Sequence, residues 1–428
     1  MREHADKSLQ NKINWLCAIV FAIFSFTFIG VYQASLLEAL YDVVATGKLK
    51  YNGYVVATIV TAVLVFVALW LNRYAKFRFE WTALAYLPSS LLLAFITDID
   101  SSIYSGENSF VMWSIILFTG AMAYTVIAYV LRGMCIYNRR YKPQLRTKIV
   151  WRNFLILTIL FCLTGLLSNS DENFKNETQA YSFYKKGDID AALNVANRSL
   201  NASHELTSSR AFYLALNNEL PNRLFAYPQY YGVEGLLPPQ KQMTPLHPDT
   251  VYTLLGTQRM QDEAALDYLR RAVKNDTLPS AALVDYYLCG LLLDKRVAEF
   301  VEELPLYYDL QSENPLPRHY KEALLYYVTA VDELELPFET DSMRAEYMKM
   351  SIMDWKDIGD LPAHYKEVLT KYAFTADGIE TLVDADSLGK EFVTMLEMEK
   401  QYPELHIRTN YIRKKYGNTY WWYFGYSE

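Results

Sequence analysis

Two acidic residues have the spacing that a metal-dependent transferase uses. Asp98 and Asp100 lie on a short polar stretch between apolar segments, and paired carboxylates there are suited to holding a divalent metal beside a phosphate. The same Asp-x-Asp spacing recurs at Asp188-Ile-Asp190 and Asp384-Ala-Asp386, which weakens it as a motif. We expect Asp98 and Asp100 to mark a membrane interface. A glycosyltransferase-like membrane enzyme with a lipid-linked donor is the alternative function.

Other residues that carry chemistry are sparse. The sequence lacks a Gly-rich phosphate loop, a Gly-x-Ser-x-Gly elbow, a His-Glu-x-x-His pair and a Cys-x-x-Cys pair. Its cysteines are widely spaced: Cys17, Cys135, Cys162 and Cys289. Neither a zinc site nor a redox dithiol is therefore expected. His319 and His364 are interpreted as structural. These observations favour a protein that is not an enzyme and predict no cofactor and no metal.

One stretch has the composition of a binding loop. Pro221 to Pro248 contains six of the fifteen prolines, and a loop this long is usually functional or disordered. Its aromatic residues argue against disorder. The predicted binding residues are Tyr227, Tyr230, Tyr231 and Leu237. The alternative is a plug that packs across the helical array.

The proline-rich loop follows a strongly apolar N-terminal half. Five stretches lack Asp, Glu, Lys, Arg and His: Ile13–Leu37, Tyr54–Asn72, Trp81–Thr97, Phe110–Leu131 and Asn153–Ser170. Each is long enough to cross about 30 Å of hydrocarbon as a helix. The sequence therefore predicts a transmembrane domain over residues 1–170 with five helices in a bundle. The third stretch is the shortest and contains Pro88.

The basic residues between these stretches predict their orientation. The first, third and fifth polar segments hold thirteen Lys and Arg, whereas the second and fourth hold only Lys48 and Lys50. Because Lys and Arg near span ends stay on the cytoplasmic side, the N-terminus is predicted to be cytoplasmic. Residues 171–428 are then predicted to be extracytoplasmic.

The second half has the pattern of a tetratricopeptide-like α-solenoid. Gly187 and the small residues Ala191, Ala192 and Ala196 reproduce the turn and close approach of such a helix hairpin. A weaker hairpin surrounds Gly256.

A sharper repeat lies further along the chain. Residues 316–327 and 361–372 agree at eight of twelve positions, 45 residues apart. In the first copy, Tyr320, Leu324 and Tyr327 are predicted to share a helix face. The fold class is therefore all-α. The aromatic segment Tyr420–Tyr426 is expected to cap the array, and the alternatives are an anchor on the outer membrane surface or a partner site.

Charge is divided between the halves. Residues 1–152 carry 15 Lys and Arg against 8 Asp and Glu, a balance of +7, and residues 153–428 carry 26 against 40, a balance of −14. Nucleic acid is excluded as a partner of the acidic half, because phosphate contacts require a cationic surface. The predicted function is a membrane-anchored scaffold that presents its helical domain to a protein, a peptide or an envelope polymer, with the lipid bilayer as the other partner.

A family resemblance rests on several of these features together. The leading spans, the Gly235-Leu-Leu-Pro238 stretch, the Leu316-Pro-Arg-His-Tyr-Lys-Glu322 helix start and the ending over residues 416–423 resemble an uncharacterised family of membrane proteins from Bacteroidota. The resemblance implies a location in the bacterial inner membrane with a periplasmic domain. It implies no activity and no catalytic residues.

Overall fold

The fold is helical throughout the described part of the chain. The computed structural model describes residues 2–45, 51–75, 77–105, 110–137, 146–197, 199, 201–240, 244–308, 316–329 and 388–427. No strand occurs among these residues, so the predicted all-α class is confirmed for them. The chain divides into two compact units, Met1–Lys186 and Gly187–Glu428. The predicted domain limits, 1–170 and 171–428, stay a prediction.

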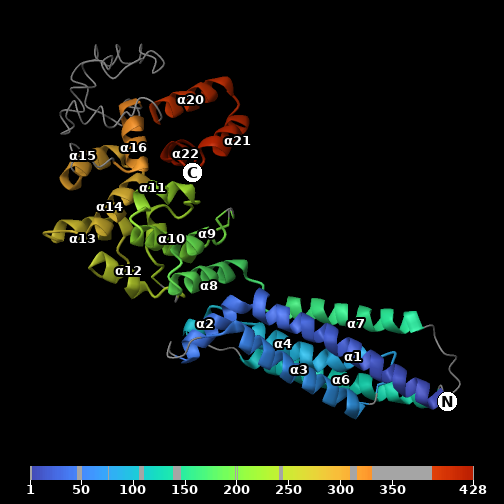
Figure 1. Cartoon of the computed structure of the whole chain (residues 1–428). Helices are drawn as coiled ribbons and strands as arrows, with labels where there is room; N and C mark the ends of the chain where they lie inside the picture. The colour runs from blue at the N-terminus through green and yellow to red at the C-terminus, as the bar shows by residue number, and fades with distance from the viewer. Residues whose placement is uncertain are drawn as a thin grey trace, which may run out of the picture. The chain divides into compact units, whose positions relative to one another are not determined.

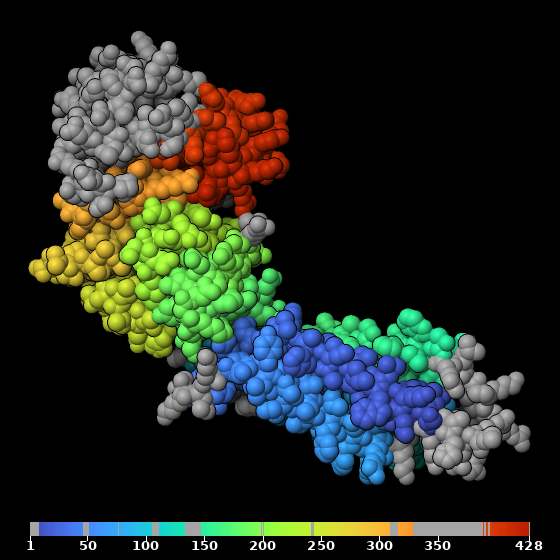
Figure 2. All heavy atoms as spheres, viewed as in Figure 1, coloured from blue at the N-terminus to red at the C-terminus, as the bar shows by residue number. Residues whose placement is uncertain are grey.

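The first unit is built from long apolar helices that lie side by side (Figure 1). Its elements are α1 (Arg2–Thr27), the π-helix η1 (Phe28–Tyr32), α2 (Ala34–Ala45), α3 (Gly53–Ala75), the 3-10 helix η2 (Thr82–Tyr86), α4 (Leu87–Thr97), α5 (Ser102–Ser105), α6 (Phe110–Tyr137), α7 (Arg146–Leu167) and α8 (Glu172–Lys185). Helices α1 and α3 pack against each other along the unit and appear as adjoining blue bands in Figure 2.

Four described helices are long and apolar enough to cross a membrane. They are Ser8–Tyr32, Gly53–Ala75, Val111–Arg132 and Thr147–Leu167. The third predicted span differs, because Trp81–Thr97 forms a 3-10 turn followed by the short helix α4. Helix α4 packs against α3, α6 and α7. Helices that could cross a membrane are therefore confirmed in this half of the chain, and a bundle of five spans stays a prediction.

The break before α4 has a local cause. Pro88 occupies the first turn of the helix, where its missing N–H costs nothing. Asn153 of α7 supports the preceding turn, because its Nδ2 donates to the Phe79 carbonyl at 2.8 Å and its Oδ1 accepts from the Ala83 N–H at 2.9 Å. Backbone groups that leave a regular helix inside an apolar environment need such partners.

The second unit is an array of shorter helices. Its elements are α9 (Ile189–Asn194), α10 (His204–Leu216), α11 (Leu220–Arg223), the 3-10 turns η3 (Leu224–Ala226) and η4 (Gly232–Leu236), α12 (Pro248–Leu255), α13 (Ala265–Asn275), α14 (Ala281–Leu293), α15 (Val297–Tyr307), α16 (Arg318–Thr329), α20 (Leu388–Gln401), α21 (Leu405–Tyr416) and α22 (Tyr420–Tyr426). Side-chain oxygens of Ser203, Ser280 and Thr419 cap α10, α14 and α22 and satisfy N–H groups of the first turn.

The predicted hairpins are only partly visible in these helices. Helix α9 has six residues, which is short for the second helix of a tetratricopeptide repeat. Gly256 ends α12 in the left-handed conformation with φ +79°, which is common after the last residue of a helix and fits the predicted turn. From α13 to α16, each helix packs against the next, and the solenoid stays a prediction.

The first copy of the twelve-residue repeat begins α16. Tyr320, Leu324 and Tyr327 are all buried, so the predicted common face is confirmed. The second copy, residues 361–372, lies outside the described residues.

The C-terminal aromatic segment packs into the second unit. Helix α22 contacts α16, and Trp421 is 1 % exposed. Its indole Nε1 donates to the Glu322 carbonyl at 2.7 Å, and the Tyr423 hydroxyl donates to the Leu293 carbonyl at 2.7 Å. These contacts join α22 to residues far apart in sequence, and its role as a cap stays a prediction.

Candidate functional site

The loop between Pro221 and Pro248 folds into compact turns. In η4, Gly232 has φ +51°, and a Cβ on Gly235 would lie 3.2 Å from Cγ2 of Thr207 in α10. Glycine is therefore favoured at position 232 by the backbone conformation and at position 235 by the close approach to α10. The turn also contacts α13 and α14.

The structure separates the four predicted binding residues into two pairs. Tyr227 is 7 % exposed and Leu237 is fully buried, whereas Tyr230 is 60 % and Tyr231 40 % exposed. The Tyr227 ring centroid lies 5.0 Å from Cζ of the buried Arg210. The buried pair therefore fixes the loop, and the exposed pair is available to a partner.

Glu234 ties the exposed turn to the chain beyond α12. Both of its carboxylate oxygens accept hydrogen bonds from Nη2 of Arg259, at 2.9 and 2.8 Å. Its Oε1 also accepts from the Ala265 N–H at 2.9 Å, at the first turn of α13. A carboxylate is favoured at a helix N-terminus, so Glu234 couples η4 to α13.

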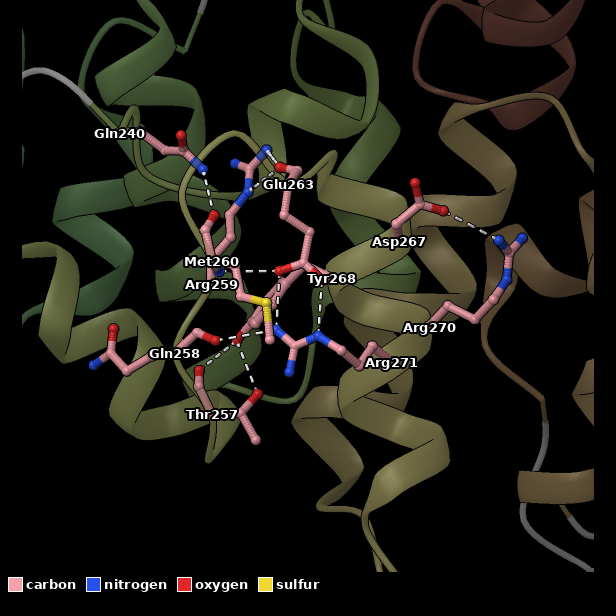
Figure 3. Close-up of polar contacts among 10 residues, drawn as sticks. All are labelled: Gln240, Thr257, Gln258, Arg259, Met260, Glu263, Asp267, Tyr268, Arg270 and Arg271. Carbon is pink, nitrogen blue, oxygen red and sulfur yellow. Dashed lines mark hydrogen bonds and ion pairs between the residues drawn. The ribbon is translucent and has the colours of Figure 1, made fainter.

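A network of polar contacts holds the segment Thr257–Ala264 in place (Figure 3). Arg271 donates from Nε and Nη2 to the two oxygens of Glu263 at 2.8 and 2.9 Å, a bidentate pair. This bonding lowers the pKa of Glu263 below its ordinary value. The Tyr268 hydroxyl donates to the Thr257 carbonyl at 2.6 Å. The segment is thus fastened at both of its ends.

His204 at the start of α10 holds the other side of the turn. Its Nε2 lies 2.6 Å from the Glu234 carbonyl oxygen and 3.1 Å from that of Leu237. The imidazole is stacked on the Tyr231 ring with centroids 5.0 Å apart. Tyr231 is therefore oriented by its neighbours, and Tyr230 is the more exposed of the two rings.

We call Tyr230, Tyr231 and the η4 turn the aromatic platform. Its chemistry suits binding, because tyrosine supplies a large contact area with few rotamers to immobilise. The fastened turn reduces the ordering cost of binding. The sequence indicated the aromatic residues, but Glu234, Arg259 and His204 were missed because their pairing depends on segments brought together by folding.

The predicted metal candidates are each engaged locally. Asp98 Oδ2 accepts a hydrogen bond from Nε1 of Trp113 at 2.6 Å, and Asp100 Oδ1 accepts from the Ser102 N–H at 2.9 Å and from its hydroxyl. Among the described residues, no group of three or more His, Cys, Asp or Glu side chains has a metal-binding arrangement. The role of Asp98 and Asp100 stays a prediction.

Two buried carboxylates in the second unit were not anticipated. Asp285 Oδ1 accepts hydrogen bonds from the hydroxyls of Tyr308 at 2.5 Å and Tyr320 at 3.0 Å. Burial raises its pKa, and these hydrogen bonds oppose that rise. Glu322 is fully buried, and its Oε2 lies 2.8 Å from Nδ1 of His319. The i, i+3 spacing of His319 and Glu322 was the available signal for this pair.

Over its described residues, the chain is a helical protein with four helices that could span a membrane and with a fastened aromatic turn. A family model described as a family of unknown function, DUF6057, matches residues 256–427. No curated protein and no solved structure matches the chain. The matched region includes the Leu316-to-Glu322 helix start and the C-terminal aromatic segment, but not the Gly235 stretch. The predicted resemblance to a family of unknown function is therefore confirmed for this part of the chain.

Proposed function

We propose that the chain is a membrane-anchored interaction protein. Its apolar helices fix its location, and the unit Gly187–Glu428 presents the aromatic platform to a protein, a peptide or an envelope polymer. The observation that carries this proposal is the 60 % exposure of Tyr230 next to a turn whose backbone is anchored by Glu234. An exposed aromatic ring on a preorganised turn is a suitable anchor for a binding interface.

The proposed location is the bacterial inner membrane, with the N-terminus in the cytoplasm and the helical unit in the periplasm. Support comes from thirteen basic residues in the predicted cytoplasmic segments against two in the predicted outer ones. A periplasmic surface of tyrosine and fastened turns then meets its partner outside the cell membrane.

Photo-crosslinking in intact cells tests the proposed interaction. A photoreactive phenylalanine analogue replaces Tyr230, and crosslinked products are identified by mass spectrometry. The matched control places the same analogue at Tyr411 of α21, which is 49 % exposed. We expect a discrete product from position 230 and none of the same mass from position 411.

Two further variants separate binding from nonspecific capture. With the analogue at position 230, Tyr231→Ala removes the second ring and Glu234→Ala removes the anchor of the turn. Both are expected to reduce the yield of the specific product without lowering the abundance of the chain. Equal products from positions 230 and 411, or an undiminished yield in both variants, would contradict the proposed function.

A further inference from the structure

A hollow lies at the end of the first candidate span, within the first unit. Its volume is about 850 Å³, and it is lined by residues from α1, η1, α2 and α8. Here the chain leaves α-helical geometry for the π-helix Phe28–Tyr32 before α2 begins. A π-bulge widens the spacing of side chains on a helix and is frequent at functional sites.

One wall of the hollow is aromatic. The rings of Phe24, Phe28 and Tyr32 follow one another along the helix, with centroids 5.4 and 5.5 Å apart and nearly parallel planes. Val31, at 69 %, and Tyr32, at 60 %, are strongly exposed. Because this wall belongs to a helix long and apolar enough to span a membrane, its natural neighbour is a lipid acyl chain.

The other wall is polar and comes from α8. Contacts with α2 hold it in place: the Ser182 hydroxyl and Lys186 Nζ both donate to Glu38 Oε2, at 2.7 and 3.0 Å. A further ion pair joins Lys185 to Asp42 at 2.7 Å. The charged side chains at this contact between α2 and α8 therefore form ion pairs with each other.

Two charges on the lining are left for a ligand. Among the described residues, no carboxylate lies within ion-pair distance of Lys175, whose Nζ is 3.5 Å from the Tyr32 ring centroid. Glu172, three residues earlier on α8, likewise has no basic partner within that distance among the described residues. The lining of the hollow thus offers one cationic and one anionic group in addition to its apolar wall.

We infer that this hollow binds one glycerophospholipid whose headgroup carries both a phosphate and a primary amine. An acyl chain lies along Phe24, Phe28 and Val31, the phosphate accepts a charge-assisted hydrogen bond from Lys175, and the ammonium pairs with Glu172. These two charges select a headgroup that carries an amine, because a headgroup with a phosphate but no amine places an anion beside Glu172. This site is independent of the aromatic platform.

Native mass spectrometry of the full chain in detergent tests the assignment. The chain is titrated with phosphatidylethanolamine or with phosphatidylglycerol, and the fraction carrying one lipid is measured. We expect tighter binding of phosphatidylethanolamine. Lys175→Gln should weaken that binding about tenfold, the loss of one charge-assisted hydrogen bond. Glu172→Gln should remove the preference between the two lipids, because phosphatidylglycerol then meets no anion.

The control is Lys12→Gln. Lys12 is an exposed lysine of α1, the helix that contributes Phe24 to the hollow, but Lys12 itself does not line the hollow. This variant should bind both lipids as the unmodified chain does. Equal binding of the two lipids by the unmodified chain would overturn the proposal. So would an unchanged affinity in Lys175→Gln, or a loss of the same size in Lys12→Gln.

Discussion

The Glu322 carboxylate accepts a hydrogen bond of 2.7 Å from the backbone N–H of Tyr420, 98 residues further along the chain. The same carboxylate accepts a hydrogen bond of 2.8 Å from Nε of Arg318 and lies 2.8 Å from Nδ1 of His319. Through these contacts α16 holds the start of α22. Both partners lie in the region matched by the family of unknown function, and their role is structural, because Glu322 is fully buried.

Removing this carboxylate should destabilise the second unit. Glu322→Ala leaves the Tyr420 N–H and the His319 ring as buried groups without their acceptor, and each such loss costs about 1 to 3 kcal/mol. We expect thermal unfolding of the full chain in detergent, followed by tryptophan fluorescence, to show a lower midpoint.

The control for Glu322→Ala is Glu391→Ala. Glu391 is half exposed and lies 3.9 Å from Arg318, so its loss should change stability by no more than about 0.5 kcal/mol. Equal midpoints for the two variants would show that the Glu322 carboxylate does not stabilise the contact between α16 and α22.

The buried carboxylate of Asp285 should make stability depend on pH. Burial raises its pKa in the folded state, so the neutral form is favoured on folding. The contribution of the neutral Asp285 carboxyl to folding stability is complete below the unfolded-state pKa of about 3.9. It is lost as pH rises through the higher folded-state pKa. Asp285→Asn keeps an oxygen acceptor for both tyrosines and should therefore gain stability relative to the unmodified chain as pH rises.

Thermal midpoints of the full chain measured from pH 4 to pH 8 check this sign. Asp267→Asn is the control, because the Asp267 side chain is 67 % exposed. A difference between Asp285→Asn and the unmodified chain that stays constant with pH, or that falls as pH rises, would show that Asp285 is not the responsible group.

Truncation of two residues in the same loop should affect different properties, stability for Leu237 and partner binding for Tyr230. Leu237 is fully buried, and Leu237→Ala should cost about 2 to 5 kcal/mol because it opens a cavity. Tyr230→Ala removes an exposed ring and should change stability by no more than about 0.5 kcal/mol, while it abolishes partner binding. Midpoints and affinity-capture yields of the two full-length variants distinguish these effects. A large loss of stability in Tyr230→Ala would favour a plug over a binding surface.

Cysteine labelling tests the proposed topology. In a chain whose other cysteines are replaced by serine, Cys135 should react with an impermeant maleimide only after the cytoplasmic side is opened. Single cysteines placed at Ser105 or Ser427 should react from outside intact spheroplasts. The reason is the excess of basic residues in the segments predicted to be cytoplasmic. Labelling of position 427 only from the cytoplasm would reverse the scheme.

Local chemistry made several features readable in the sequence. Stretches without charged residues predicted the apolar helices, because a charged side chain is costly inside a membrane. A helix is the expected form of such a stretch, because it satisfies its own backbone polar groups. Gly256 predicted a tight turn between helices, and it ends α12 with φ +79°. The spacing of Tyr320, Leu324 and Tyr327 predicted their common buried face. Each of these depends on residues within a few positions of one another.

The tertiary structure decided what depends on distant partners. Trp81–Thr97 is as uncharged as the other spans, yet Asn153 from α7 supports a 3-10 turn there and α4 remains short. Tyr227 and Tyr230 are the same residue type in the same loop, but of the two only Tyr227 contacts the buried Arg210. Hydrophobic periodicity specifies which face of a helix is apolar. The segment that covers that face, and so the side chains left exposed for a partner, is set by long-range packing and hydrogen bonding.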